Sequence, residues 1–195
     1  MLLLAINCMT YYGTRLITTH ATHHSMKLPI DDWIPFCPFF VSFYVIAFIQ
    51  WGVGFYLIIR ESKASCYRVL VTDFIVMSIC LVCFLCYPTT IVRPTVMKNG
   101  IWEWLTVLIY RMDKPDNLFP SLHCVFSWIC FRGAMHLKKV PKWYVPLTFV
   151  ISVLVFASTL LIKQHVIVDM IGAVIVVEIG LFLSGIWCRE EKLHG

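Results

Sequence analysis

Long apolar segments separated by short polar ones dominate this sequence. A membrane-spanning helix needs about 20 mostly apolar residues. Four segments meet that requirement: residues 36–59, 69–87, 144–162 and 166–187. Residues 121–137 form a shorter candidate that carries Arg132 and His136 near its far end, where long side chains can reach the membrane interface.

The first apolar segment, residues 2–18, is the weakest candidate and has the length of a signal peptide. It has no basic residues before its apolar stretch and no clear small-residue cleavage site after it. We therefore interpret it as a short first span. The pattern predicts an all-α polytopic membrane protein with six transmembrane helices, forming a single domain over residues 1–195.

Residues 144–187 are nearly continuous apolar sequence. As one helix they would be about 66 Å long, roughly twice the thickness of a bilayer core. The chain must therefore fold back within this segment. Its only polar break is Lys163-Gln164-His165, which is where we place the hairpin turn.

One long connection, residues 88–120, joins the third and fourth predicted spans. Loops of this length in a compact domain are usually functional. Its middle part, residues 101–110, is apolar and contains Trp102 and Trp104, but it is too short to cross a bilayer. We expect an interfacial helix there.

The composition agrees with a membrane protein. Hydrophobic residues make up 59% of the 195 residues and charged residues 14%, against about 25% charged in a soluble domain. This excludes a disordered chain, a nucleic-acid-binding domain and an ordinary soluble enzyme. The net charge of +5 instead points to basic cytoplasmic loops.

The distribution of these basic residues predicts the orientation of the chain. Two short loops and the C-terminal tail are basic and fall on one side, which the positive-inside rule makes cytoplasmic. Both termini are then cytoplasmic. The basic residues of the other side are interspersed with acidic ones. The cytoplasmic set is Arg60, Lys63, Arg68, Lys138, Lys139, Lys142, Arg189 and Lys192.

Three segments carry polar residues that loops and orientation do not explain. They are residues 87–94, 116–123 and 158–169, each at the end of a predicted span. The six-span arrangement puts all three on the outer side. Since the hydropathy count does not use these residues, their convergence independently supports a functional site there.

The third segment contains His165 and Asp169, four residues apart at a predicted helix start. This spacing places both on one helix face. The carboxylate can then accept from one imidazole nitrogen and leave the other free as a nucleophile or base. A polar pair that merely packs against a neighbouring helix is the alternative, but burying an Asp in a span is costly, which favours a functional role.

The second segment begins a helix at Pro120-Ser121, and His123 lies in its first turn. A helix N-terminus offers free N–H groups to an anion, and a histidine there can protonate a leaving oxygen. With Arg93 and Lys163 on the same side, the residues indicate an anion-binding pocket.

The sequence resembles the type 2 phosphatidic acid phosphatase superfamily. Phe119-Pro-Ser-Leu-His123 and His165-x-x-x-Asp169 are similar to two of its three signatures, and Arg93-Pro94 to the end of the third. The resemblance implies metal-independent phosphoryl transfer without a cofactor. In it, His165 attacks phosphorus, Asp169 orients His165 and His123 protonates the leaving oxygen. Phosphate is held by Arg93, Ser121 and Lys163.

Two positions depart from the family pattern. Cys86 stands where the first signature has a Lys, and Thr159 where the third has an Arg. Lys163, two residues before the expected nucleophile, is similar to a basic residue of the lipid phosphotransferases that include sphingolipid synthases. The acceptor is therefore water or a lipid alcohol. The favoured expectation is a lipid phosphate phosphatase acting on the outer face of the cell membrane.

Two readings from other classes stay open. His20-x-x-His23-His24 resembles one histidine box of a di-iron membrane oxidase, although no second cluster exists in the sequence. A non-catalytic transporter or scaffold would use the intramembrane residues Asp73, Arg132 and Glu178. The sequence predicts a lipid phosphate and membrane lipids as binding partners and no nucleic acid, and it leaves the particular lipid open.

Overall fold

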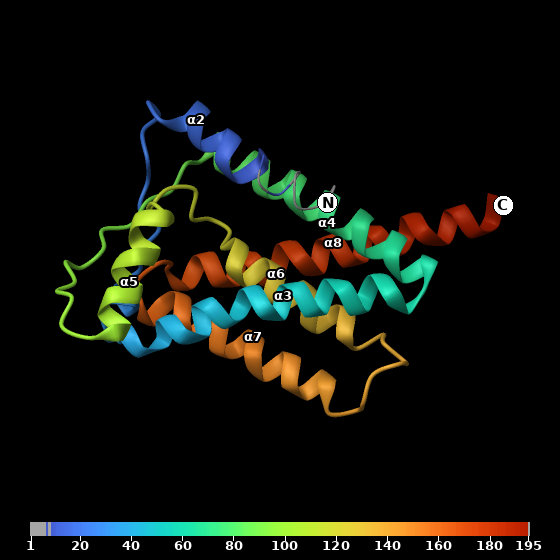
Figure 1. The fold of residues 1–195 in the computed structure, drawn as a ribbon. Helices are drawn as coiled ribbons and strands as arrows, with labels where there is room; N and C mark the ends of the chain where they lie inside the picture. Colours follow the sequence, from blue (N-terminus) through green and yellow to red (C-terminus); the bar gives the residue numbers. More distant parts are fainter. Residues whose placement is uncertain (1–6, 8, 195) are drawn as a thin grey trace.

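The protein is a bundle whose long α-helices run in roughly one direction (Figure 1). The computed structural model describes residues 7 and 9–194. Within them there is no β-strand, only two isolated backbone bridges. The all-α prediction is confirmed. Four long helices form the frame: α3 (Val41–Glu61), α4 (Lys63–Cys86), α7 (Tyr144–Leu161) and α8 (Ile167–His194).

These four helices contain the segments that are long and apolar enough to cross a bilayer. The candidate spans are Pro38–Glu61, Lys63–Cys86, Tyr144–Leu161 and Ile167–Gly185. Large apolar side chains such as Phe74, Val82 and Phe182 are exposed on their outer faces. Apolar exposure of this extent is typical of a surface that contacts lipid.

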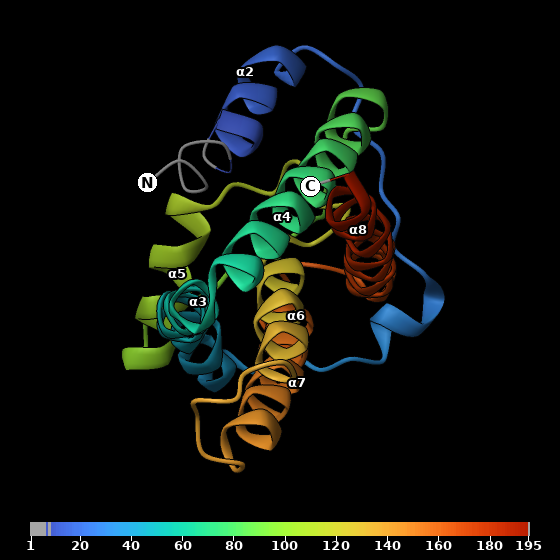
Figure 2. The same ribbon diagram turned by 90° about the vertical axis from the view of Figure 1, so that its right-hand side faces the viewer.

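A fifth helix, α6 (Leu122–Ala134), lies among the long ones. It packs against α3, α7 and α8, and more than half of its residues are buried (Figure 2). Its 13 residues make it about 20 Å long, shorter than a bilayer core. The segment predicted as a span at residues 121–137 is thus a shorter, central helix, and the count of six spans stays a prediction.

The predicted first span lies only partly within the described residues. Residues 9–18 form a π-helical turn, η1 (Met9–Gly13), followed by α2 (Thr14–Thr18), and both pack against α4. Asn117 Nδ2 donates to Thr14 Oγ1 at 2.9 Å, and Arg15 pairs with Asp116 at 2.9 Å. This segment is therefore tied to the loop that precedes α6.

The hairpin turn forms where the polar break predicts it. α7 ends at Leu161 and α8 begins at Ile167. The backbone N–H groups of Gln164 and His165 both donate to the Thr159 carbonyl, at 2.9 and 3.1 Å. The turn is thus closed by backbone hydrogen bonds, which fix the position from which His165 projects.

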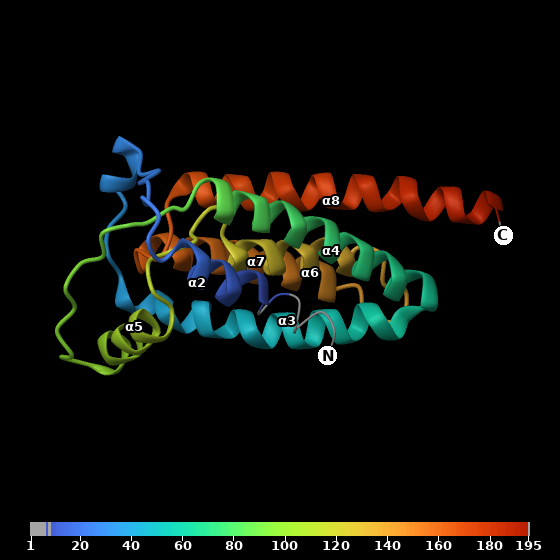
Figure 3. The same ribbon diagram turned by 90° about the horizontal axis from the view of Figure 1, so that it is seen from above.

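The long connection contains the expected helix, α5 (Ile101–Met112). It runs across one end of the bundle (Figure 3). Trp102, Leu105 and Ile109 pack against buried Tyr44 and Ile162. The helix is confirmed, whereas its position at a membrane interface stays a prediction.

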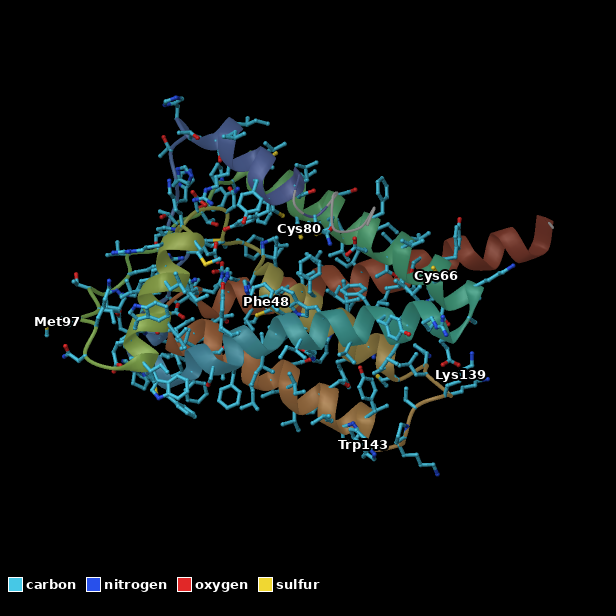
Figure 4. All side chains as sticks on the ribbon, in the orientation of Figure 1. Phe48, Cys66, Cys80, Met97, Lys139 and Trp143 are labelled. Atoms are coloured by element: carbon cyan, nitrogen blue, oxygen red, sulfur yellow. The ribbon has the colours of Figure 1, made fainter. Side chains whose placement is uncertain are left out.

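The bundle has two chemically different ends. At one end lie α5, the long loop with Met97 and the α7–α8 turn; at the other lie the α3–α4 and α6–α7 loops, near Cys66, Lys139 and Trp143 (Figure 4). We call the first the turn end and the second the loop end. Two short 3-10 helices, η2 (Pro29–Asp32) and η3 (Pro38–Phe40), belong to the turn end.

Candidate active site

A histidine–carboxylate pair lies at the start of α8. His165 Nδ1 is 3.1 Å from Asp169 Oδ2, and that oxygen also accepts from the Val166 N–H at 3.1 Å. The His165 side chain is 7% exposed and that of Asp169 is 1% exposed. Because the carboxylate binds Nδ1, the ring keeps its Nε2 atom available for chemistry.

His165 faces a pocket of about 350 Å³ at the turn end. Arg93 and Lys163 line the same pocket, so the structure brings together three of the six residues that the sequence singled out. Other lining residues are Lys27, Asp31, Asp32, Ile34, Phe36, Ile91, Val92, Pro94, Leu160 and Val166.

The Arg93 guanidinium is held from behind the pocket. Its Nη1 atom donates to the Asp113 carbonyl at 2.6 Å and to the Tyr110 carbonyl at 3.4 Å, and its Cζ atom lies 4.6 Å from the Tyr110 ring centre. Burial lowers the pKa of Arg93, and the nearby Asp113 carboxylate opposes that shift. Since an arginine stays protonated in proteins, the pocket contains a fixed positive charge.

Lys163 adopts an unusual backbone conformation, with φ of 54°. Non-glycine residues rarely occupy this left-handed region, and they do so mostly where the surroundings enforce it. Lys163 Nζ donates to the carbonyls of Asp31 and Ile34, at 3.0 and 2.6 Å. An ammonium has three N–H donors, so one is left for an anion in the pocket.

Asp31 joins the segment before α3 to the start of α8, a role that sequence reasoning missed. Its Oδ1 accepts from the Ile167 N–H at 2.9 Å and its Oδ2 from the Leu28 N–H at 2.8 Å. The residue is 4% exposed. Asp31 therefore satisfies a free N–H at the helix N-terminus and supports the turn that presents His165. The acidic pair after Pro29 was its only sequence signal.

Ser121 and His123 lie at the start of α6, outside the set of residues that line the pocket. The fully buried Ser121 donates its N–H to the Asp169 carbonyl at 3.2 Å, which connects the second segment to the third. The His123 ring stacks on Tyr44, with ring centres 3.9 Å apart, and also contacts Trp51. Its buried Nε2 atom has no hydrogen-bond partner among the described residues.

Asp113 is a second residue that the sequence did not single out. It accepts from the hydroxyl groups of Tyr11 and Tyr44, and from Gln164 Nε2 at 3.5 Å. Burial alone would raise its pKa, but the charges of His123 and His165 and the tyrosine hydrogen bonds outweigh burial and lower the pKa. Asp113 is thus a half-buried carboxylate within electrostatic reach of both candidate catalytic histidines.

Thr89 completes the convergence of the three polar segments. Its Oγ1 accepts from the N–H groups of Leu118 and Phe119, both at 2.9 Å. The first segment therefore holds the loop that leads into α6. The expectation that the three segments meet is confirmed; their location on the outer side of a membrane stays a prediction.

The two positions that depart from the family pattern have different surroundings. Cys86 is exposed on the last turn of α4. Thr159 is fully buried, with its hydroxyl 3.8 Å from Cys124 Sγ, where an arginine has no room in this packing. The pocket contains one further cation, Lys27, which is paired with Asp32. Sequence reasoning had given Lys27 no role.

The contacts of the described residues give little support to the two alternatives, a di-iron oxidase and a non-catalytic transporter or scaffold. Over residues 7 and 9–194, no three His, Cys, Asp or Glu side chains are grouped to hold a metal ion. His24, from the histidine-rich run, stacks on Tyr87 with ring centres 4.5 Å apart. Glu178 pairs with Arg132 at 3.0 Å and accepts from Trp128 at 2.8 Å. These contacts are those of a structural network.

Fold and site together define a membrane protein with a cation-lined pocket beside a buried histidine–carboxylate pair. The model of the PAP2 superfamily matches residues 22–183, and the chain belongs to this superfamily. The resemblance to type 2 phosphatidic acid phosphatases is thereby confirmed. Members are generally phosphatases, which supports an activity of that type. No curated protein and no solved structure matches the chain.

Proposed function

We propose that this protein is a membrane-embedded lipid phosphate phosphatase that works through a phosphohistidine. The observation that carries the proposal is the His165–Asp169 contact at the edge of a pocket that also contains Arg93 and Lys163. A buried nucleophile, an orienting carboxylate and two cations are what phosphoryl transfer requires. The chemistry is that of hydrolysis of a phosphomonoester or pyrophosphate, without a metal or cofactor.

In the first step, the lone pair of His165 Nε2 attacks phosphorus, and the bond between phosphorus and the lipid oxygen breaks. Asp169 accepts from Nδ1–H and stabilises the positive charge that develops on the ring. His123 donates a proton to the leaving oxygen. In the second step, water attacks the phosphohistidine, the P–N bond breaks, and His123 takes up the proton of the water.

Electrostatics around the pocket support this division of roles. Arg93 offers a planar pair of donors and Lys163 a point charge to the phosphoryl oxygens. Ser121 stands at the N-terminus of α6, where the helix dipole favours an anion. Burial lowers the pKa of His123, and the negative charge of Asp113 opposes that shift, so Asp113 is the group that supports a proton on His123.

The orientation of the site follows from the loops at the other end of the bundle. Arg60, Lys63 and Arg68 surround the α3–α4 connection, and Lys138 and Lys139 belong to the α6–α7 connection. Short basic loops are retained in the cytoplasm. We therefore place the loop end in the cytoplasm and the active site on the extracytoplasmic face of the cell membrane.

Phosphate release by the purified protein tests the proposal. The substrates are phosphatidic acid, lysophosphatidic acid, phosphatidylglycerol phosphate, a sphingoid phosphate and a polyprenyl pyrophosphate. We expect turnover of at least one of them. His165→Ala should lower it by about 10⁴-fold or more, because the nucleophile is lost. The matched control is His136→Ala at the loop end, which should keep activity within about twofold.

Two further conditions separate this mechanism from its alternatives. Turnover should persist in EDTA; loss that added Mg²⁺ reverses would contradict a metal-independent phosphohistidine. Product that forms only when an acceptor lipid is added would identify a lipid phosphotransferase instead. Full turnover by His165→Ala would show that His165 is not the nucleophile.

A further inference from the structure

A second pocket, of about 510 Å³, lies at the loop end of the bundle. It is formed between α3, α4, α6 and α8, and it shares no lining residue with the pocket at the turn end. Its volume is in the range of small-molecule sites. The side chains that define its character are Ile58, Arg68, Val69, Arg132, His136 and Leu181.

The polar part of this pocket is cationic. Arg68 and Arg132 come from α4 and α6, and His136 follows the end of α6. The buried Nε atom of Arg68 has no hydrogen-bond partner among the described residues. Burial and then the charges of the two arginines lower the pKa of His136, so these groups lie within electrostatic reach of one another.

No acidic side chain lines the pocket among the side chains described, which extend to residue 185. Glu178 pairs with Arg132 and accepts a hydrogen bond from Trp128 Nε1. Among the side chains described, which extend to residue 185, Arg68 makes no ion pair, and Glu178 balances only one of the two arginines. The positive charge that these described side chains leave favours an anion as the ligand of the pocket.

The remaining walls are apolar, which decides between possible anions. Ile58, Val69, Ile129 and Leu181 are side chains of the long helices or of α6. A free phosphate would gain nothing from them. An amphiphile with a phosphate group and an acyl chain would contact both parts, because basic pockets between transmembrane helices suit the headgroups of anionic lipids.

We propose that this loop-end pocket binds the phosphate headgroup of an anionic phospholipid from the cytoplasmic leaflet. Arg68 and Arg132 contact the phosphate oxygens, and the first carbons of an acyl chain lie along Ile58 and Val69. The choice of leaflet rests on the orientation proposed above. Binding at the pocket itself requires no catalytic residue and no turnover.

Thermal stabilisation of the full chain by added lipid measures this binding. The protein is purified in a neutral detergent and titrated with phosphatidylglycerol, with phosphatidylcholine as the neutral lipid and inorganic phosphate as the free anion. We expect phosphatidylglycerol to raise the Tm in a saturable manner, and the other two to have little effect. Arg68→Gln should weaken the apparent affinity about fivefold to tenfold, since one cation contact is lost.

Arg60→Gln is the matched control, because Arg60 is an exposed arginine at the same end that does not line the pocket. It should bind phosphatidylglycerol like the unchanged protein. Arg93→Gln should also do so, which separates this pocket from the active site. If Arg68→Gln does not fold, Arg68→Lys provides the same comparison and should retain part of the affinity.

Three outcomes would overturn the proposal. Equal weakening by Arg60→Gln would show general attraction to surface charge. Equal stabilisation by inorganic phosphate would show a free-anion site, and loss of binding in Arg93→Gln alone would assign the lipid to the turn-end pocket. None of these outcomes depends on whether the protein hydrolyses lipid phosphates, so failure here and failure of the proposed function are distinguishable.

Discussion

Two carboxylates of helix α8, Asp169 near the turn end and Glu178 further along the helix, have opposite surroundings. At the turn end, Asp169 is 1% exposed and accepts from both His165 and the Val166 N–H. Toward the loop end, the Glu178 side chain is 40% exposed and its arginine partner is 34% exposed. The first pair is enclosed by protein, whereas the second is open to its surroundings.

This difference in exposure indicates that the site at the turn end is fixed in geometry, whereas the pocket at the loop end can adapt to its ligand. Burying an ionised carboxylate is costly unless hydrogen bonds are supplied, and at the turn end Asp169 Oδ2 receives two of them, from His165 and from the Val166 N–H. Such support holds reacting groups in place before a substrate arrives. At the loop end, Arg132 pairs with Glu178, whereas the Nε atom of Arg68 has no hydrogen-bond partner among the described residues, which suits a headgroup of variable geometry better than a reaction.

The largest expected effect is on turnover, in a comparison of these two carboxylates. Asp169→Asn should lower phosphate release by about 10³- to 10⁴-fold with little change in fold, because an amide cannot hold His165 in the tautomer with a free Nε2 lone pair. Glu178→Gln, the matched change in the same helix, should stay within about twofold. Steady-state phosphate release and circular dichroism of both variants provide the measurement.

Equal activity of the two variants would contradict the assignment. It would mean that the His165–Asp169 contact, like the Arg132–Glu178 ion pair, contributes to packing and not to turnover. An Asp169→Glu variant is a further check, because it keeps the negative charge but places it on a longer side chain. Partial activity there, above that of Asp169→Asn, would indicate that the carboxylate charge contributes in addition to its hydrogen bond.

The second expected effect is on acid stability and concerns Asp113. Its pKa is lowered in the folded protein, so its contribution to stability is present above the unfolded pKa of about 3.9 and is lost as the pH falls through the lower, folded value. Asp113→Asn should therefore reduce the free energy of unfolding by about 1–3 kcal/mol at pH 7. That deficit should shrink below about pH 4.

Thermal unfolding in detergent between pH 3.5 and pH 7.5 measures this difference. Glu178→Gln is again the comparison, because it makes the change of a carboxylate to an amide in a side chain that is 40% exposed. A deficit for Asp113→Asn that is the same at every pH would show that the carboxylate charge does not stabilise the fold. The loss of stability in Asp113→Asn would then come from the changed shape of the side chain and not from the lost charge.

Much of the site was predictable because a few residue types in fixed spacing carry its chemistry. The four-residue spacing of His165 and Asp169 predicted their contact, and the polar break at residues 163–165 predicted the turn. Charges are scarce in this sequence, so those at helix ends stood out. The all-α class could be predicted from the length of the apolar segments. A helix can cross a bilayer because it satisfies its backbone hydrogen bonds within one segment.

The supporting residues were not predictable, because their role depends on contacts between distant parts of the chain. Asp113 binds Tyr11, 102 residues away in sequence, and Asp31 binds the Ile167 N–H, 136 residues away. No local pattern encodes such pairings. The length of α6 was also missed, because a central helix surrounded by other helices is as apolar as one that crosses the bilayer.

The smallest expected effect compares two glycines that adjoin bulky side chains at opposite ends. A Cβ atom at Gly172 would lie 2.3 Å from Phe119 Cε2, and one at Gly133 would lie 2.3 Å from Ile58 Cδ1. The Ile58 atom ends a flexible side chain and can move aside. The Phe119 ring is rigid and immediately precedes Pro120 and Ser121, so its displacement shifts the start of α6.

Gly172→Ala should therefore lower phosphate release by about threefold to tenfold, since small misplacements of reacting groups reduce rates steeply. Gly133→Ala should leave turnover unchanged, and both should lower the free energy of unfolding by about 1–2 kcal/mol through overpacking. Turnover and Tm measured on the same preparations separate the two effects. Equal losses of turnover would mean that the position of α6 depends on packing at both ends of the bundle, so that the turn end is not held independently of the loop end.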